Sequence, residues 1–215
     1  MTGRVGVGVN LRKNIRIDAS INGSTTTNKG FGKDVNPMSY ATTMNRAIPA
    51  YDENGEPVFY QVAGGYEYNS RVKSLAYNFI NERDNSGSRI EETHLSASLN
   101  FSWDILDWLK YEFTGGYTRA QNNNETWSLE KTYYIASKFR GYDYGTVEPG
   151  SAEFKAAMLP FGGVLATIDG LSSSYNIQNK LLVSKTFNED HRLNVMLGME
   201  LRSSSVKSNA NRVFG

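Results

Sequence analysis

The sequence predicts an all-β fold, an antiparallel up-and-down meander, and two observations carry this prediction. The first is a regular alternation of apolar and polar residues in three stretches, residues 3–24, 91–120 and 174–205. Each stretch divides at a short polar turn into two runs of matching parity, as a hairpin with one apolar face requires. The second is spacing, because long connections at residues 25–90 and 121–173 separate the three hairpins. Six strands therefore follow one another, joined alternately by short turns and long loops.

The first hairpin, residues 3–24, carries its apolar residues at odd positions on both runs. In the register that keeps one face apolar, Val9 is expected to face Ile17 and Val5 to face Ile21. We place its turn at residues 12–14.

The second hairpin, residues 91–120, shows the clearest alternation in the chain, and we place a five-residue connection at residues 104–108. A single register puts all of its apolar residues on one face. That register pairs Trp103 with Leu109, Phe101 with Tyr111, Leu99 with Phe113, Ala97 with Gly115, and Leu95 with Tyr117.

The third hairpin, residues 174–205, repeats this pattern across a turn at residues 188–190. Its odd-numbered apolar residues include Ile177, Leu181, Val183 and Phe187 before the turn, and Leu193, Val195, Leu197, Met199 and Leu201 after it. All three hairpins are thus expected to share one apolar surface.

The first long connection contains signals for a short helix and two turns. Asn36 and Pro37 are suited to the N-cap and first position of a helix over residues 38–47. Acidic residues, Asn and Gly at residues 52–55 predict a turn between two extended runs, and the polar cluster at residues 81–87 predicts another.

The second long connection predicts one short helix, over residues 151–159, which Pro160 would end. Together the two connections hold 17 of the 26 aromatic residues. Aromatic faces stack on sugar rings, so these loops are candidates for a ligand-binding surface. The alternative is that the aromatic residues pack the loops against one another.

The long connections also discriminate between two architectures. A soluble β-sandwich shows the same alternation, but compact domains rarely contain structureless connections longer than about 12–15 residues. An outer-membrane barrel has tilted strands of about ten residues, short turns, long outer loops and an apolar outer face. We therefore predict that the six strands form part of a large transmembrane β-barrel with long extracellular loops.

Composition excludes several other classes of protein. The chain has 215 residues, a net charge of +1 and no Cys. The absence of Cys excludes a disulfide framework and thiolate chemistry, and the balanced charge argues against a nucleic-acid surface. No apolar run approaches the 18 or so residues of a membrane helix. The chain begins directly in a strand without a leader peptide, so we expect it to be an excerpt of a longer protein.

No catalytic, metal-binding or cofactor-binding residue is predicted, and substrate-binding residues remain unassigned. Gly6 and Gly8 lack the third glycine and following helix of a phosphate loop, so we interpret them as strand glycines. Asp52, Glu53 and Glu56 lack the spacing of a calcium loop.

The remaining candidate acid, base or metal-binding groups do not converge either. His94 and His191 have no second ligand at metal-binding spacing. The adjacent carboxylates at residues 91–92 and 189–190 do not form an acid/base pair. We expect a protein that is not an enzyme and that has no cofactor.

Several motifs, found in order along almost the whole chain, resemble a known family. It is the SusC/RagA-like TonB-dependent transporters of Bacteroidetes outer membranes. The motifs are Asn36-Pro37, Ile48-Pro49-Ala50-Tyr51, Ile80-Asn81-Glu82, Asp84-Asn85-Ser86, the hairpin from Leu95 to Tyr117, Arg140-Gly141, Leu159-Pro160-Phe161-Gly162-Gly163, the stretch from Ser174 through Asn179, Lys185-Thr186-Phe187, His191, Gly198 and Glu200.

This resemblance implies a barrel of about 22 strands, closed by an N-terminal plug, in the cell outer membrane. It further implies TonB-dependent import of glycans or peptides together with a SusD-like surface lipoprotein. The chain itself contains no plug, TonB box or closing strand, so it would be one arc of the barrel wall in contact with lipid. Two alternatives stay open: a TonB-dependent siderophore or cobalamin receptor, and a soluble all-β carbohydrate-binding module.

Overall fold

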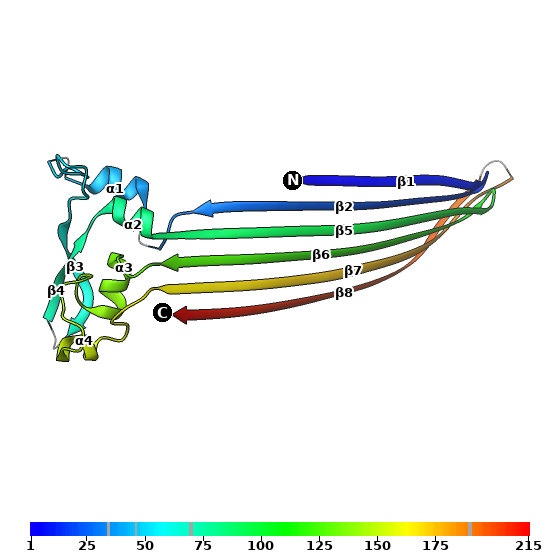
Figure 1. The fold of residues 1–215 in the computed structure, drawn as a ribbon. Coiled ribbons are helices and arrows are strands. Elements are labelled where there is room, and N and C mark those ends of the chain that lie inside the picture. Colours follow the sequence, from blue (N-terminus) through cyan, green and yellow to red (C-terminus); the bar gives the residue numbers. More distant parts are fainter. Residues whose placement is uncertain (34, 46, 69–70, 189–190) are drawn as a thin grey trace. The chain divides into compact units, whose positions relative to one another are not determined.

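A computed structural model describes residues 1–33, 35–45, 47–68, 71–188 and 191–215, with the backbone alone described between 63 and 73. The chain is mainly antiparallel β-structure, which confirms the predicted all-β, antiparallel class. A six-stranded sheet has the order β1-β2-β5-β6-β7-β8, and β3 and β4 form a separate pair (Figure 1). The strands are β1 (Thr2–Arg12), β2 (Ile15–Gly30), β3 (Tyr60–Tyr68), β4 (Arg71–Tyr77), β5 (Ser86–Leu106), β6 (Leu109–Ser128), β7 (Val164–Phe187) and β8 (His191–Phe214).

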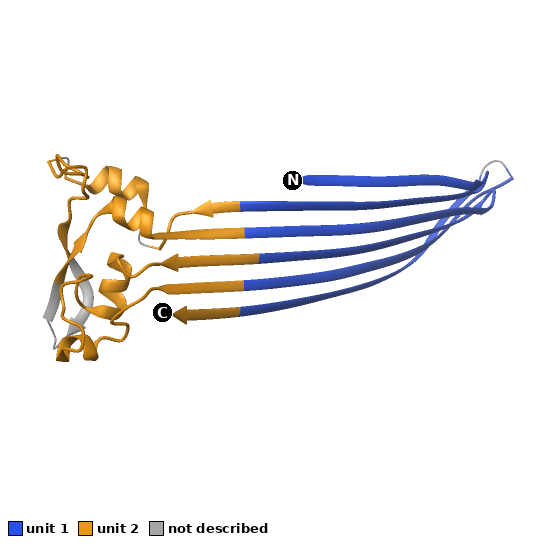
Figure 2. Ribbon diagram, viewed as in Figure 1, with its two compact units in different colours: residues 1–27, 91–122, 169–209 blue, residues 28–90, 123–168, 210–215 orange. Residues whose placement is uncertain are grey.

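The chain divides into two compact units (Figure 2). The sheet unit comprises residues 1–27, 91–122 and 169–209, which form three hairpins of consecutive strands. The loop unit comprises residues 28–90, 123–168 and 210–215, and includes β3, β4, all the helices and the far ends of five long strands.

The first hairpin has the predicted register. Val9 pairs with Ile17 and Val5 pairs with Ile21, which places these four side chains on one face. The predicted three-residue turn was wrong, because β1 ends at Arg12 and β2 begins at Ile15. An irregularity between Asn10 and Arg12 supplies the extra residue instead, so the parity is preserved.

The second and third hairpins are longer than the alternation predicts. The strands β5 to β8 contain 20 to 24 residues each. The predicted five-residue connection shrinks to a turn at residues 107–108. Of the turn predicted at residues 188–190, positions 189 and 190 lie outside the described residues. The prediction missed the extensions of β5, β6 and β8 because the distal halves of these strands carry polar residues at both parities. A hydrophobic period of two cannot signal a strand there.

Two short helices confirm the capping signals. Helix α1 (Pro37–Thr43) has Asn36 as its N-cap, with the side chain accepting a hydrogen bond from the Ser39 amide at 3.0 Å. Helix α4 (Ala152–Ala156) is capped in the same way by Ser151, which accepts from the Phe154 amide at 3.2 Å. Both helices end a few residues before the predicted boundary.

The turn predicted at residues 81–87 was wrong, because helix α2 (Phe79–Asn85) and the start of β5 occupy it. The side chain of Asn78 caps this helix by accepting from the Asn81 amide at 3.0 Å. The β3–β4 pair, helix α3 (Tyr133–Ile135) and the π-helical turn η1 (Ala136–Arg140) were not predicted.

Every buried residue of the described chain lies in the loop unit. Its apolar core contains Ile135, Phe139, Leu159 and Val164. The Phe139 ring also packs edge-on against Phe214 near the end of β8, with centroids 5.6 Å apart. None of the described helices is long and apolar enough to cross a membrane.

Candidate functional site

The two faces of the sheet unit differ sharply in chemistry. Even-numbered residues form a polar face, on which neighbouring strands exchange side-chain hydrogen bonds. Four such contacts are Ser20–Ser98 at 2.9 Å, Asn22–Ser96 at 3.3 Å, Gln178–Glu200 at 2.9 Å and Ser184–Asn194 at 2.8 Å. The odd-numbered residues form the opposite, apolar face. Among the residues described in this unit, none is buried, so no second layer of the chain covers either face.

We call the apolar part of the odd face the apolar band. It runs from Leu95 to Trp103 on β5, from Leu109 to Tyr117 on β6 and from Leu193 to Leu201 on β8. Each run is about nine residues long, or about 26 Å at the usual rise along a strand. Leu99 and Leu197, near its middle, are 43% and 69% exposed.

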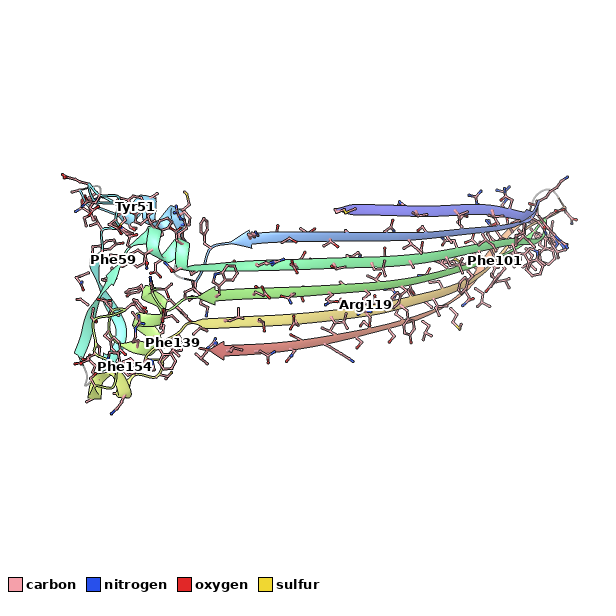
Figure 3. The ribbon with its side chains drawn as sticks, viewed as in Figure 1. Tyr51, Phe59, Phe101, Arg119, Phe139 and Phe154 are labelled. Atoms are coloured by element: carbon pink, nitrogen blue, oxygen red, sulfur yellow. The ribbon has the colours of Figure 1, made fainter. Side chains whose placement is uncertain are left out.

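The apolar band ends abruptly along each strand. On β6 the odd parity changes from Tyr117 to Arg119, and polar residues follow. Figure 3 labels Phe101, within the band and near the tight turns, and Arg119, beyond it. Near the turns the Lys185 ammonium lies 5.2 Å from the ring centroids of both Trp108 and Phe187. Aromatic and cationic residues thus mark the turn-side border of the band.

The loop unit is organised around a buried carboxylate. Glu82 on α2 is 1% exposed and accepts hydrogen bonds from the Tyr133 amide at 2.7 Å and from Asn81 Nδ2 at 3.1 Å. The bond from Tyr133 attaches α3 to α2, which come from the two long connections of the chain. A buried carboxylate needs such donors, because its desolvation is otherwise costly.

The buried side-chain amide of Asn78 holds together parts of the first long connection, residues 25–90. Asn78 is 2% exposed, and its Nδ2 donates to the carbonyls of Ala50 at 3.0 Å and Val58 at 2.8 Å. Its oxygen caps α2 at the same time. The resulting framework is rigid enough to hold pockets, since both hydrogen-bonding ends of the side chain are engaged.

The first pocket of the loop unit, the tyrosine pocket, has a volume of about 350 Å³. Four tyrosines contribute to its wall, with Lys33, Asn36, Ser39, Thr43, Met44 and Val62; these tyrosines are Tyr40, Tyr60, Tyr77 and Tyr133. The rings reinforce one another. Tyr60 and Tyr133 each meet Tyr77 edge-on with centroids 5.5 Å apart, and Tyr40 stacks on Phe79 at 4.4 Å. Burial, and then the nearby Tyr40, raise the pKa of Tyr60, so its hydroxyl stays protonated at neutral pH.

Such a pocket suits a sugar. Aromatic rings offer flat apolar faces, while phenol, hydroxyl and amide groups supply the hydrogen bonds that orient a polyol. The loop aromatics divide between rings packed in the core and rings that line the pocket. Phe139, for example, packs within the core, whereas Tyr40 and Tyr60 line the pocket.

A second pocket, of about 320 Å³, shares Tyr133 with the first. Its wall includes the charged residues Lys131, Arg140 and Asp143 and the aromatic residues Phe59 and Tyr144. We call it the arginine pocket.

The residues considered as sites from the sequence are placed in strands and turns. Gly6 and Gly8 lie within β1, as interpreted. Asp52 holds its own turn: Oδ1 accepts from the amides of Asn54 at 2.8 Å and Glu56 at 2.9 Å. These amide bonds, led by that from Glu56, lower the pKa of the Asp52 carboxyl.

The remaining candidates do not assemble into a cluster. His94 lies in β5 with Glu91 and Glu92, whereas His191 begins β8. The carboxylates at residues 189–190 lie outside the described residues. No group of three or more His, Cys, Asp or Glu side chains is arranged to hold a metal ion within the part of the chain that the structure describes.

Sequence reasoning missed the two most buried charged residues, Glu82 and Arg140. Their partners lie far along the chain or on backbone atoms, so no local spacing identifies them. The local signal here was limited to the N-cap Asn78, because Glu82 lies four residues after it and not at the three-residue spacing of a capping box.

Comparisons with known proteins do not identify a family for the chain. No family model matches the chain, and a search of curated proteins finds no match.

Proposed function

We propose that the chain is an arc of the wall of a large outer-membrane β-barrel, in a SusC/RagA-like TonB-dependent transporter. The transporter imports glycans or peptides together with a SusD-like surface lipoprotein, and draws energy from the TonB complex through a plug. The role is transport, without catalysis or a cofactor.

The apolar band is the observation that carries this proposal. A strand that crosses a bilayer at a tilt needs about 9–11 residues, and a barrel exposes an apolar belt about 25 Å tall, bordered by aromatic residues. Each run of the band is about nine residues long, close to the length that a tilted strand needs; the band is bordered on the turn side by aromatic residues, and its side chains are exposed. In water an apolar surface of this kind would be covered, because its exposure is unfavourable by about 25 cal/mol per Å².

The polar face fits the same proposal. Residues such as Ser98 and Gln178 would line a hydrated interior, where hydroxyl and amide groups remain solvated. The edges of β1 and β8 would pair with further strands of the wall, because an open edge leaves backbone groups without partners in lipid.

The tyrosine pocket supports a glycan as the imported molecule. Its polar and aromatic lining matches a sugar ring better than it matches an extended peptide. A siderophore or cobalamin receptor would share the barrel wall and differ in this preference.

Two experiments test the proposal: cell fractionation tests the location of the protein, and gene deletion tests its role in uptake. We expect the protein in the outer-membrane fraction after alkaline extraction and, in detergent, bound to a surface lipoprotein. Loss of the gene and loss of TonB should each abolish uptake of the same oligosaccharide. Recovery in the soluble fraction would contradict the proposal, whereas membrane-bound protein that takes up an iron chelate would point to the receptor alternative.

A further inference from the structure

We propose that the arginine pocket binds the carboxylate of an acidic saccharide, such as a uronic acid residue. The site belongs to the loop unit alone, and all of its lining residues lie there. The choice of a saccharide rests on the proposed function. The choice of an acidic one follows from charge.

The pocket contains a buried cation whose hydrogen bonds go to backbone carbonyls. Arg140 is 3% exposed; its Nε donates to the carbonyl of Tyr142 at 3.1 Å and its Nη2 to the carbonyl of Glu130 at 2.8 Å. Burial lowers the pKa of Arg140, yet a guanidinium stays protonated in proteins. Carbonyl oxygens orient this group without cancelling its charge.

The nearby carboxylates are already engaged with backbone amides. Asp143 Oδ1 accepts from the Ala76 amide at 2.9 Å, and Glu130 Oε2 accepts from the Gly162 amide at 3.2 Å. Arg140 makes no salt bridge with any carboxylate of the described chain. Lys131 adds a second, exposed cation to the same wall. Among the residues that line the pocket, Lys131 and Arg140 carry two positive charges and Asp143 one negative charge, so the lining has a surplus of one positive charge that an anion would balance.

Aromatic rings next to the cations select for a sugar. Tyr144 lies 5.6 Å from both the Arg140 guanidinium and the Lys131 ammonium, measured from its ring centroid, and is 49% exposed. Phe59, labelled in Figure 3, is 48% exposed and lines the same pocket. A pyranose ring could stack on such a face while its carboxylate reaches the cations.

Size and backbone geometry agree with this ligand. A volume of about 320 Å³ lies at the lower end of the range for small-molecule pockets, and suits one or two sugar rings. Arg140 is the last residue of the π-helical turn η1, which ends at Gly141 with φ of 82°. Isolated π-turns occur frequently at functional sites, because they redirect side chains that an α-helix would align.

Calorimetric titration of the full chain in detergent micelles tests the site. The probes are a galacturonic acid disaccharide, the matching neutral galactose disaccharide and a glutamate dipeptide. We expect saturable binding of the acidic sugar, and we expect salt to weaken this binding. The neutral sugar should bind at least about tenfold more weakly than the acidic one. Equal binding of both sugars, or no binding of the acidic one, would overturn the proposal. A preference for the dipeptide would overturn the choice of a saccharide.

Two variants locate the binding event. Lys131→Gln should weaken binding of the acidic disaccharide about five- to tenfold, whereas Lys138→Gln removes the same charge from an exposed position of η1 outside the pocket and should leave it unchanged. Both residues are exposed, so both variants keep the fold. Equal effects would place the binding elsewhere. Failure of this titration in a protein that still resides in the outer membrane and imports an oligosaccharide would reject the site and leave the proposed function intact.

Discussion

The sheet unit and the loop unit differ in where their apolar side chains lie: the loop unit buries a core of them, and the sheet unit leaves them exposed or half-buried. The loop unit buries Ile135 completely and surrounds it with Phe139, Leu159 and Val164. The sheet unit buries none of its described residues, although its odd parity is almost continuously apolar along the band. A protein interior explains the first unit. Under the proposed function, lipid would surround the apolar band of the second.

The largest expected effect concerns the whole chain in plain buffer. Without detergent or lipid, we expect the expressed chain to aggregate, because the band is exposed among the described residues and β1 and β8 lie at open edges of the described sheet. Size-exclusion chromatography with and without detergent measures this. A single monomeric peak in plain buffer, melting cooperatively, would break the comparison between the two units.

The next largest effect is a difference between the two units in the stability lost when one apolar side chain is truncated to alanine. Ile135→Ala should destabilise the loop unit by about 2–5 kcal/mol, because it opens a cavity in a packed core. Leu99→Ala, its control in the sheet unit, should change stability in micelles by only about 0.5 kcal/mol, because Leu99 is 43% exposed. Amide hydrogen exchange in micelles reports both. Similar losses for the two variants would argue that Leu99 also packs against protein.

A charge placed on either face of β5 tests which face contacts lipid and which contacts water. Leu99→Arg should lower the stability of the membrane-inserted protein by about 2–4 kcal/mol, since an arginine near the midplane of the bilayer is costly. Ser98→Arg, one residue away on the polar face, should be tolerated. Folding into lipid vesicles, followed by gel mobility, compares the two, and an equal penalty would count against the assignment.

A smaller effect should follow from loss of a helix cap in the loop unit. Asn36→Ala removes the acceptor for the Ser39 amide and should destabilise α1 by about 1 kcal/mol. Asn36→Asp, which keeps an acceptor, is the matched control. Faster exchange of the α1 amides in the alanine variant alone is the expected result, and unchanged exchange would show that the cap contributes nothing.

Sequence patterns revealed what depends on local chemistry. The pairing of Val9 with Ile17 followed from parity, and α1 followed from Asn36 and Pro37. Beyond Tyr117 both parities become polar, so the hydrophobic period of two disappears and no pattern predicts a strand. The strand nevertheless continues, because neighbouring strands provide its backbone hydrogen bonds.

The interior of the loop unit could not be predicted, for a related reason. The Glu82 carboxylate binds an amide 51 residues away, and Arg140 binds backbone carbonyls that no residue type identifies. The polar residues 81–85 looked like part of a turn, although they belong to helix α2, whose N-cap is Asn78. Long-range partners of this kind have no local signature, and the pockets depend on them.

Cysteine labelling on adjacent residues of β5 tests the central claim most directly. The chain contains no Cys, so Leu99→Cys and Ser98→Cys each introduce a unique thiol. In outer membranes, Ser98→Cys should react with a water-soluble maleimide at least about tenfold faster than Leu99→Cys, which should instead react with a lipid-soluble maleimide. Equal rates with the water-soluble reagent, or a faster reaction at Leu99→Cys, would contradict the assignment of the apolar band to lipid.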